Sequence, residues 1–232
     1  KFAPIVVRAL SEAGQSENIS PGLKKLSDEF KAKGLEAVGF PCHMGDNEQI
    51  RELAESTIKN LGGIDIIVNN AAANPVFGPV QDAGDEAFDK IMASNVRSNH
   101  WLCQMVAPDM HAKGRGAIMI TSSTGAFSGS EVLGTYNISK LADIALVRNL
   151  ALEWGPKGVR VNAICPGLIK TDFAKALWDN PEAAERVTTA TPLRRFGEAD
   201  DFGGIVVYLA SDASSYVTGQ ALTICGGTHM YR

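Results

Sequence analysis

The sequence lacks an excess of positive charge and has no long apolar run. Its 22 Lys and Arg are outnumbered by 26 Asp and Glu, which gives a net charge of −4 at pH 7. We therefore expect no nucleic acid partner, because no basic stripe is present to meet phosphates. No apolar stretch approaches the roughly 18–20 residues that span a bilayer, and the first residues lack the layout of a signal peptide. We expect no membrane partner and a cytoplasmic location.

Cysteine is scarce, and its spacing offers no metal site. The four cysteines lie tens of residues apart without any C-x-x-C pair, at Cys42, Cys103, Cys165 and Cys225. Because structural zinc is usually held by closely spaced ligands, we predict no metal site. We interpret the cysteines as buried free thiols, which pack like small hydrophobic side chains.

The chain alternates short apolar runs with longer amphipathic stretches from residue 36 onward. The expected strands are Glu36–Met44, Ile64–Asn70, Gly116–Ser123, Val159–Pro166 and Ala221–Cys225. The expected helices are Asn47–Leu61, Asp85–Lys113, Tyr136–Trp154 and Ala199–Leu209. Strand and helix in alternation predict an α/β fold with a doubly wound parallel sheet. At 232 residues, we expect a single domain over residues 1–232.

The first 35 residues do not fit this pattern. Their periodicity predicts helices at Val6–Ala13 and Pro21–Ala32, without strands before them. A glycine-rich G-x-G-x-x-G-like turn, which cradles the pyrophosphate of a dinucleotide, is also missing. Either the chain has lost these parts, or the sequence skips residues near Ala3–Pro4 and Gly14–Gln15. We favour skipped residues.

The strongest local signal is the pair Tyr136 and Lys140. Four residues apart on a predicted helix, the two side chains share one face. A tyrosine normally titrates at about pH 10, and a nearby ammonium group favours the phenolate and lowers the pKa. This arrangement suits Tyr136 to general acid/base chemistry. The spacing also occurs by chance in many helices, so an exposed helix face is the alternative interpretation.

Ser123 follows the apolar run Ala117–Ile120, at the carboxyl end of a predicted strand. Ligands bind at this edge of open α/β sheets. A hydroxyl there could hold a substrate oxygen while Tyr136 moves the proton. The alternative is a turn serine among its polar neighbours.

Three further segments combine small and polar residues. Asn69-Asn70-Ala71-Ala72 follows a predicted strand, where it is either a plain turn or lets the backbone approach a ligand. Pro166–Thr171 follows another strand, where a Pro-Gly turn would present backbone groups and the Thr171 hydroxyl to a ligand. Asn95 is unusual inside a helical pattern, because asparagine competes for backbone hydrogen bonds. It is either a surface residue or the mark of a kink that holds a water.

Together these motifs resemble the short-chain dehydrogenase/reductase family. Asn69–Ala72 is similar to that family's N-N-A-G signature, and Ser123, Tyr136 and Lys140 have its catalytic order and spacing. Asn95 matches its fourth catalytic member, and Pro166-Gly167 with Thr171 resembles the segment that closes over the cofactor. The resemblance runs from about residue 36 to the C-terminus. It is strongest to the NADP-dependent carbonyl and retinal reductases.

The resemblance implies a Rossmann-type fold and an oxidoreductase that moves hydride between a nicotinamide dinucleotide and a carbonyl or alcohol. By it, Tyr136 is the general acid/base, Lys140 lowers its pKa and binds the ribose, Ser123 orients the substrate, and Asn95 supports a proton relay through water. Ile169 would contact the carboxamide through its backbone, and Thr171 the phosphates. The implied cofactor-binding residues are Asn69, Ala71, Tyr136, Lys140, Pro166, Gly167, Ile169 and Thr171.

Some residues depart from the family pattern. Ala72 replaces a glycine, His43 an aspartate that contacts adenine, and Cys225 the aspartate of a C-terminal D-G-G. The strand end that distinguishes NAD from NADP is expected just before Gln15, within the skipped residues, and Gln15-Ser16-Glu17-Asn18 gives no unambiguous signal. The resemblance favours NADP, with NAD possible. A non-catalytic dinucleotide-binding module is the alternative to an enzyme.

Substrate class and assembly complete the expectations. The stretch Leu168 to Leu193 should form an apolar lid, which favours a hydrophobic ketone, aldehyde or secondary alcohol. Apolar residues over several faces of two helices predict a homotetramer, notably Trp101, Leu102, Met105, Leu146 and Leu150.

Overall fold

Four parallel strands form the main sheet of the computed structural model, which describes residues 5–10, 21–35, 37–171 and 174–230. In spatial order they are β3 (Ile66–Asn69), β4 (Gly116–Thr121), β5 (Val159–Pro166) and β6 (Ala221–Ile224). A second, two-stranded parallel sheet pairs β1 (Ile5–Leu10) with β2 (Ala37–Cys42). Parallel pairing requires crossover connections, which helices provide here. The predicted parallel α/β architecture is confirmed.

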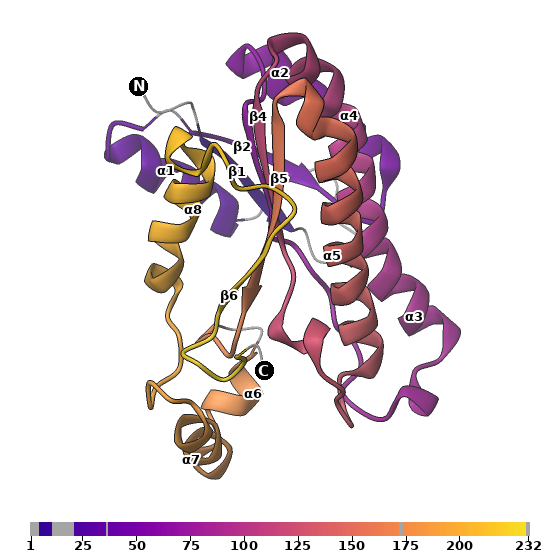
Figure 1. Ribbon diagram of the computed structural model, residues 1–232, viewed down its shortest axis with the longest axis vertical. Coiled ribbons are helices and arrows are strands. Elements are labelled where there is room, and N and C mark those ends of the chain that lie inside the picture. Colours follow the sequence, from indigo (N-terminus) through magenta and orange to yellow (C-terminus); the bar gives the residue numbers. More distant parts are fainter. Residues whose placement is uncertain (1–4, 11–20, 36, 172–173, 231–232) are drawn as a thin grey trace.

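Helices cover both faces of the strands (Figure 1). One layer holds α2 (Asn47–Leu61), α4 (Ser98–Lys113) and α5 (Gly134–Trp154), with α3 (Asp85–Met92) beside it. The other face carries α1 (Pro21–Ala32) and α8 (Gly203–Ala210), and α6 (Lys175–Trp178) and α7 (Pro181–Ala190) lie beyond the end of β6. None of the described helices combines the length and the hydropathy needed to cross a bilayer.

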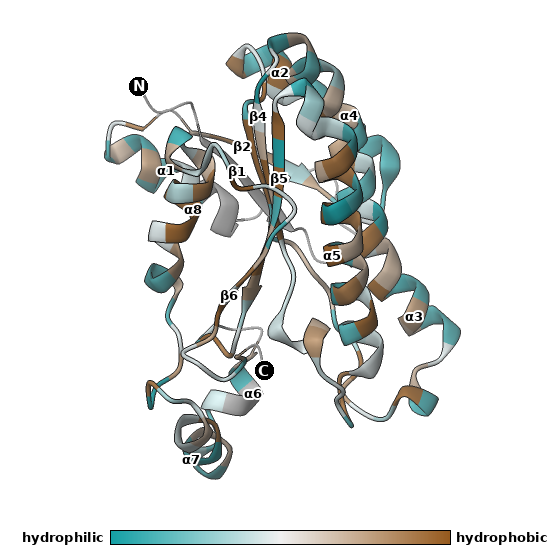
Figure 2. Cartoon of the chain, in the orientation of Figure 1, coloured by the Kyte–Doolittle hydropathy of each residue, from teal (hydrophilic) through white to brown (hydrophobic). Residues whose placement is uncertain are grey.

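The central strands β4 and β5 are covered on both faces, and this explains the apolar sequence of β4 (Figure 2). In β5 the apolar run is interrupted by Arg160 and Asn162, whose side chains donate hydrogen bonds to Ser214 and to the Val217 carbonyl. Ile118 and Val161 pack toward α4 and α5, whereas Met119 and Ile164 pack toward Leu209 of α8. Burying each such side chain contributes about 1.5–3 kcal/mol. The two strands are thus packed between the helix layers. This packing fixes the positions of the loops that follow the strands.

The helix that crosses from β2 to β3 begins and ends as predicted. The Asp46 carboxylate accepts hydrogen bonds from the backbone N–H groups of Glu48 and Gln49, at 3.0 and 3.2 Å. These bonds satisfy donors that a helix start leaves unpaired. At the other end Gly62 adopts the left-handed conformation with φ 80°, which closes α2 after Leu61.

The structure corrects the prediction for the first residues. The helix predicted at Val6–Ala13 is wrong over residues 5–10, which form β1 in register with β2 from Ile5 opposite Ala37. The β-branched side chains at the start of this run favour a strand, and short apolar runs do not distinguish the two structures by periodicity. A strand therefore does precede α1, which itself confirms the helix predicted at Pro21–Ala32. The gaps expected near Ala3–Pro4 and Gly14–Gln15 lie outside the described residues.

Among the described strands, β3 is paired on one side only, with β4. Its Ile67 is buried against the α2 and α4 layer, whereas Ile66 and Val68 on the opposite face are 41% and 43% exposed. The described strands thus form two hydrogen-bonded sheets, β1–β2 and β3–β6. The loops that follow β3, β4 and β5 all lie at the carboxyl edge of the second sheet.

Candidate active site

The expected site residues gather at the carboxyl edge of the main sheet. Asn69 ends β3 opposite Ile120, Thr121 ends β4 opposite Ile164, and Pro166 ends β5. Because the strands are parallel and in this register, the segments that follow them leave the sheet side by side. This edge is where open α/β sheets bind ligands.

Ser123 and Tyr136 come together at this edge from two elements. Ser123 caps a short 3₁₀ turn, Thr124–Phe127, and its Oγ accepts a hydrogen bond from the Gly125 N–H at 3.0 Å. Tyr136 lies in the first turn of α5, and the Ser123 side chain is hydrogen-bonded to its phenol. The turn-serine interpretation of Ser123 is therefore confirmed, and the same hydroxyl also contacts the Tyr136 phenol. That Ser123 holds a ligand stays a prediction.

The pKa of Tyr136 moves in the direction opposite to the one expected from its spacing to Lys140. Burial, followed by the charge of Asp143, raises the pKa of Tyr136 to about 12, and the hydrogen bond from Ser123 opposes this only in part. The Lys140 Nζ lies 5.6 Å from the centre of the ring. The predicted lowering is thus wrong for this structure, because burial and the Asp143 charge dominate the pKa of Tyr136. The ammonium group of Lys140 is held by a partner of its own.

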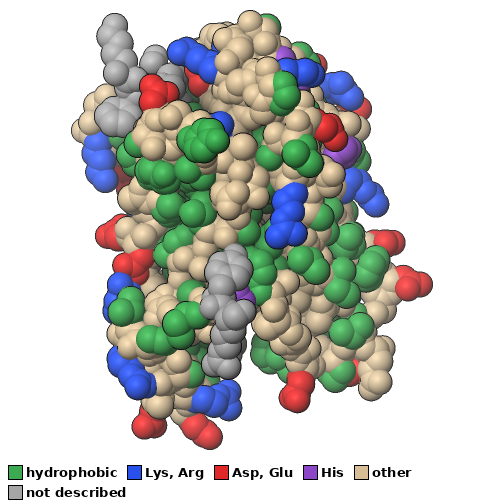
Figure 3. All heavy atoms as spheres, viewed as in Figure 1, with side chains coloured by type: hydrophobic (Ala, Val, Ile, Leu, Met, Phe, Trp, Pro, Cys, Tyr) green, Lys and Arg blue, Asp and Glu red, His purple; other side chains and the backbone are tan. Residues whose placement is uncertain are grey.

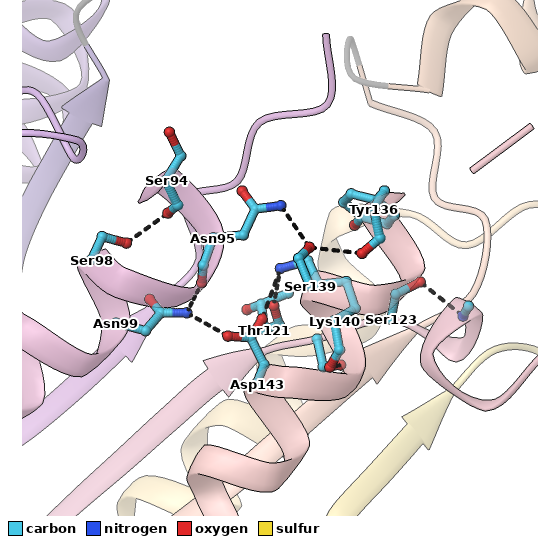
Figure 4. A network of polar contacts seen from close by, with 12 residues as sticks. Ser94, Asn95, Ser98, Asn99, Thr121, Ser123, Tyr136, Ser139, Lys140 and Asp143 are labelled. Atoms are coloured by element: carbon cyan, nitrogen blue, oxygen red, sulfur yellow. Dashed lines mark hydrogen bonds and ion pairs between the residues drawn. The ribbon is translucent and has the colours of Figure 1, made fainter. Parts of the chain in front are cut away.

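That partner is Asp143, one helical turn after Lys140 (Figure 4). Lys140 is 1% exposed, and its Nζ donates to the Thr121 carbonyl at 2.8 Å and to Asp143 Oδ2 at 3.2 Å. The alternative of an exposed helix face is therefore wrong for Lys140. A buried charge requires a partner, and Asp143 supplies it.

Asp143 itself is fully buried and was not among the predicted site residues. Burial raises the pKa of its carboxyl, against the lowering effects of the Lys140 charge and of a hydrogen bond from Asn99. The signal for it was an aspartate among the apolar residues Leu141, Ala142, Ile144 and Ala145, three residues after a lysine that shares its face.

Asn95 lies in a π-helical turn, Ala93–Arg97, between α3 and α4. It is fully buried, so the surface alternative is wrong, and the helix is interrupted here by a π-helical turn, in agreement with a kink. That the kink holds a water stays a prediction. Its side-chain amide bonds the backbone N–H and carbonyl of Ala73, at 2.7 and 3.0 Å, and donates to the Ser139 hydroxyl at 3.0 Å. Asn95 thereby ties the loop after β3 to α5.

The Asn69–Ala72 segment and His43 lie at the same end of the strands. Asn69 is buried and its Nδ2 donates weakly to Cys103 Sγ at 3.7 Å, while its Oδ1 has no hydrogen-bond partner among the described residues. Ala71 packs partly against the core. The exposed His43 ring accepts from the Gly45 N–H at 3.2 Å and so stabilises its own turn.

The segment after β5 follows the edge of a small cavity. A Cβ on Gly167 would lie 2.9 Å from the Cys225 backbone, so glycine is required for this close approach. Ile169 forms a parallel bridge with Gly197, and the exposed Thr171 accepts a hydrogen bond from the Trp178 indole on its carbonyl at 2.7 Å.

The cavity, of about 160 Å³, is lined by apolar side chains and by the paired Arg195 and Asp201. Its walls come from the segment after β5, the loop after α7 and the end of β6. Two of the expected lid residues, Phe173 and Leu177, are outside the described residues or side chains. From the stretch 168–193, the described residues Leu168, Ile169, Thr191 and Leu193 line the cavity, and the apolar lid stays a prediction.

Known proteins resemble the chain over nearly its whole length. A family model described as Enoyl-(Acyl carrier protein) reductase matches residues 7–229. Human Dehydrogenase/reductase SDR family member 4 is 38% identical over 227 residues, which cover 96% of this chain and 82% of that protein. The described chain thus has a relative that it matches almost from end to end.

Two solved structures share the fold. A 7 alpha-hydroxysteroid dehydrogenase complexed with NADH and 7-oxo glycochenodeoxycholic acid superposes with a TM-score of 0.89 at 34% identity, over 97% of this chain and 84% of that one. A gluconate 5-dehydrogenase from Burkholderia cenocepacia in complex with NADP and tartrate gives a TM-score of 0.89 at 26% identity, over 97% and 85%.

The buried pair predicts that Lys140 and Asp143 must be replaced together. Lys140→Met alone leaves a buried carboxylate without its partner and is expected to lower the free energy of unfolding by about 3–5 kcal/mol. The double variant Lys140→Met/Asp143→Leu is expected to recover most of this loss, because apolar side chains fill the space without a charge. Urea unfolding measures all three proteins.

A matched control comes from an exposed pair on α1. Lys25 lies 3.9 Å from Glu29 with both side chains largely in solvent, so Lys25→Met should change the stability by less than about 1 kcal/mol. A Lys140→Met protein as stable as the control would contradict the buried ion pair.

Proposed function

The chain belongs to the short-chain dehydrogenase/reductase family, and from this premise we propose that Tyr136, Ser123 and Lys140 form its catalytic centre, with Asn95 in support. The enzyme transfers hydride between a nicotinamide dinucleotide and a carbonyl or alcohol substrate. The observation that carries the proposal is the meeting of Ser123 and the Tyr136 phenol beside the buried Lys140, at the carboxyl edge of the sheet.

In carbonyl reduction, Tyr136 gives its phenolic proton to the substrate oxygen, and in alcohol oxidation it takes that proton back. Ser123 orients the oxygen, and Asn95 supports the relay of protons toward Lys140. The nicotinamide supplies or accepts the hydride when bound. A pKa of about 12 keeps the phenol protonated near neutral pH, which suits a proton donor. Because the resemblance is strongest to carbonyl reductases, we favour carbonyl reduction as the working direction.

The groups at the edge fit the nicotinamide half of a dinucleotide. Tyr136 and Lys140 would hold the ribose, Ile169 the carboxamide, and the exposed Thr171 hydroxyl a phosphate. Asn69, whose buried Oδ1 lacks a partner in the described chain, and Ala71 would line the other side, with Pro166 and Gly167 opposite. We propose NADP(H) as the cofactor, with NAD(H) possible, since relatives of the same fold are described with NADP and with NADH.

The cavity beside this edge supports a hydrophobic substrate. Its lining is mostly apolar, and its two charged side chains neutralise each other, with Arg195 and Asp201 paired at 2.7 Å. Such a wall recognises apolar surface and leaves no free charge for a phosphorylated ligand. We propose a medium-sized ketone, aldehyde or secondary alcohol.

We also propose a reducing compartment, the cytosol. The four cysteines form no disulfide with one another, and three of them are buried. Free thiols persist where the cellular environment keeps them reduced.

The centre is tested by Tyr136→Phe. The ring still packs on α5, but no proton can move, so we expect turnover to fall at least about 100-fold, with dinucleotide affinity within a few-fold of wild type. The assay follows the absorbance of the reduced nicotinamide, and the affinity is measured by fluorescence titration. A kcat near the wild-type value would overturn the assignment of Tyr136.

We propose that the chain forms a homotetramer. The residues that support the contacts between subunits differ from those predicted from the sequence. Leu102 and Leu150 are buried in the chain's own core, and Trp101, Met105 and Leu146 pack against it. Other apolar side chains are exposed, on α5 and, across the sheet, on α8: Ile138, Leu141, Leu152 and Val207. Figure 3 shows hydrophobic side chains along the visible side of α5. Two such faces fit a tetramer, which needs two different two-fold contacts.

Light scattering tests the assembly. The wild-type protein is expected at four times the chain mass of 24.7 kDa, and Leu141→Glu, which places a charge in the proposed contact, at a smaller mass. Leu35→Glu, at an exposed apolar position after α1 that is not among the residues of the two proposed faces, is the matched control. A monomeric wild type at micromolar concentration would reject the tetramer.

A further inference from the structure

Asp143 is a buried charge that the proposed reaction does not use. Both of its oxygens are engaged: Oδ1 accepts from Asn99 Nδ2 at 2.9 Å, and Oδ2 accepts from Lys140 Nζ at 3.2 Å. An ionised carboxylate removed from water is costly unless such partners compensate it. Its position beside the candidate catalytic lysine suggests a role other than stability.

The geometry around Lys140 shows what Asp143 restrains. The ammonium group has three donors on a flexible four-carbon stem. One donor is directed to Thr121 at the end of β4 and one to Asp143 on α5, so two elements hold the group. The third donor has no hydrogen-bond partner among the described residues, and Nζ lies 5.6 Å from the centre of the Tyr136 ring. Without the carboxylate, only the Thr121 carbonyl would hold Nζ.

Asn99 in turn fixes the carboxylate. Its Nδ2 donates both to Asp143 Oδ1 and to the backbone carbonyl of Asn95, at 2.9 and 2.6 Å. The Asn95 side chain is itself bonded to the loop after β3 and to Ser139 on α5. A continuous chain of protein hydrogen bonds therefore runs from the π-helical turn to Lys140 (Figure 4).

We propose that Asp143 is a positioning residue, which holds Lys140 in its working orientation and is itself oriented by Asn99 from the π-helical turn. This inference rests on the proposed function and deepens it. It adds two residues, Asp143 and Asn99, that act on the reaction through Lys140 without touching the substrate.

Apart from Lys140, the titratable groups that face Asp143 are neutral near pH 7, so none of them competes with Lys140 for its charge. From α4 comes Cys103, whose thiol pKa burial raises to about 12, and from β5 comes Cys165, whose pKa burial raises to about 11. Both thiols are neutral near pH 7. On α5 itself lie Lys140 and Tyr136, so Lys140 is the one cation facing Asp143 among the described residues.

The test compares Asp143→Asn with wild type across pH. Loss of the Lys140 orientation is expected to lower kcat about 10-fold or more, while KM for the carbonyl substrate changes less than about three-fold. The Asp143 charge raises the pKa of Tyr136, so its removal lowers that pKa. Carbonyl reduction needs the protonated phenol, so its loss of activity with rising pH should begin roughly one pH unit lower.

A second readout is independent of turnover. A buried, hydrogen-bonded lysine ammonium exchanges slowly with water, so Lys140 should give a ¹H–¹⁵N side-chain NMR signal, assigned by its loss in Lys140→Met. Asp143→Asn should broaden or remove this signal. If the wild-type protein reduces no carbonyl, the proposed function fails, and the NMR comparison alone decides the positioning role.

Two further variants keep the test decisive. Asn99→Ala keeps the ion pair but removes the hydrogen bond that orients the carboxylate. It should shift the pH profile and weaken the ammonium signal in the same direction as Asp143→Asn, but to a smaller extent. If Asp143→Asn does not fold, Asn99→Ala alone tests the proposal. Thr57→Val removes another buried hydrogen bond, from Oγ1 to the Leu53 carbonyl on α2, and should leave both readouts unchanged. A wild-type pH profile and an intact ammonium signal in both site variants would overturn the proposal.

Discussion

The centre of this molecule is organised around one buried ammonium group, which needs hydrogen-bond partners. Lys140 lies inside the protein, where an unpaired charge would cost several kcal/mol, so the chain supplies the Thr121 carbonyl and the Asp143 carboxylate. The second oxygen of Asp143 accepts a hydrogen bond from Asn99, and Asn99 also donates to the backbone carbonyl of Asn95 in the π-helical turn. The end of β4, the first turns of α5 and the junction of α3 with α4 are thus held in one hydrogen-bonded arrangement beside Tyr136 and Ser123.

This arrangement depends on the parallel sheet beneath it. Because β3, β4 and β5 end at a common edge, small residues and hydroxyl groups that are far apart in sequence meet there. The helix layers clamp β4 and β5 through side chains that alternate between the two faces. The apolar core therefore positions the site, and the polar network sets its chemistry. Burial keeps the phenol protonated, which is consistent with a donor of protons to a carbonyl oxygen.

Much of this could be predicted from sequence, where the signal is local. The bounds of α2 follow from the Asp46 cap and the glycine after it, and those of β5 from an apolar run ended by Pro166-Gly167. The sequence patterns gave wrong predictions where contacts between distant parts of the chain determine the structure. Periodicity predicted a helix where residues 5–10 pair with β2, and the four-residue spacing of Tyr136 and Lys140 could not reveal that Asp143 holds the ammonium group. The expected kink at Asn95 is a π-helical turn whose partners, Ala73 and Ser139, are distant in sequence.

The account's central claim is that this edge of the sheet carries out hydride transfer to a carbonyl, although the described chain includes no glycine-rich turn for the pyrophosphate. The most direct measurement is the absorbance of NADPH, and in parallel of NADH, mixed with the wild-type protein and a series of hydrophobic ketones and aldehydes. We expect the absorbance to fall with several members of the series, and faster with NADPH. A protein that binds the dinucleotide but consumes neither form with any carbonyl would contradict the account and indicate a non-catalytic dinucleotide-binding module.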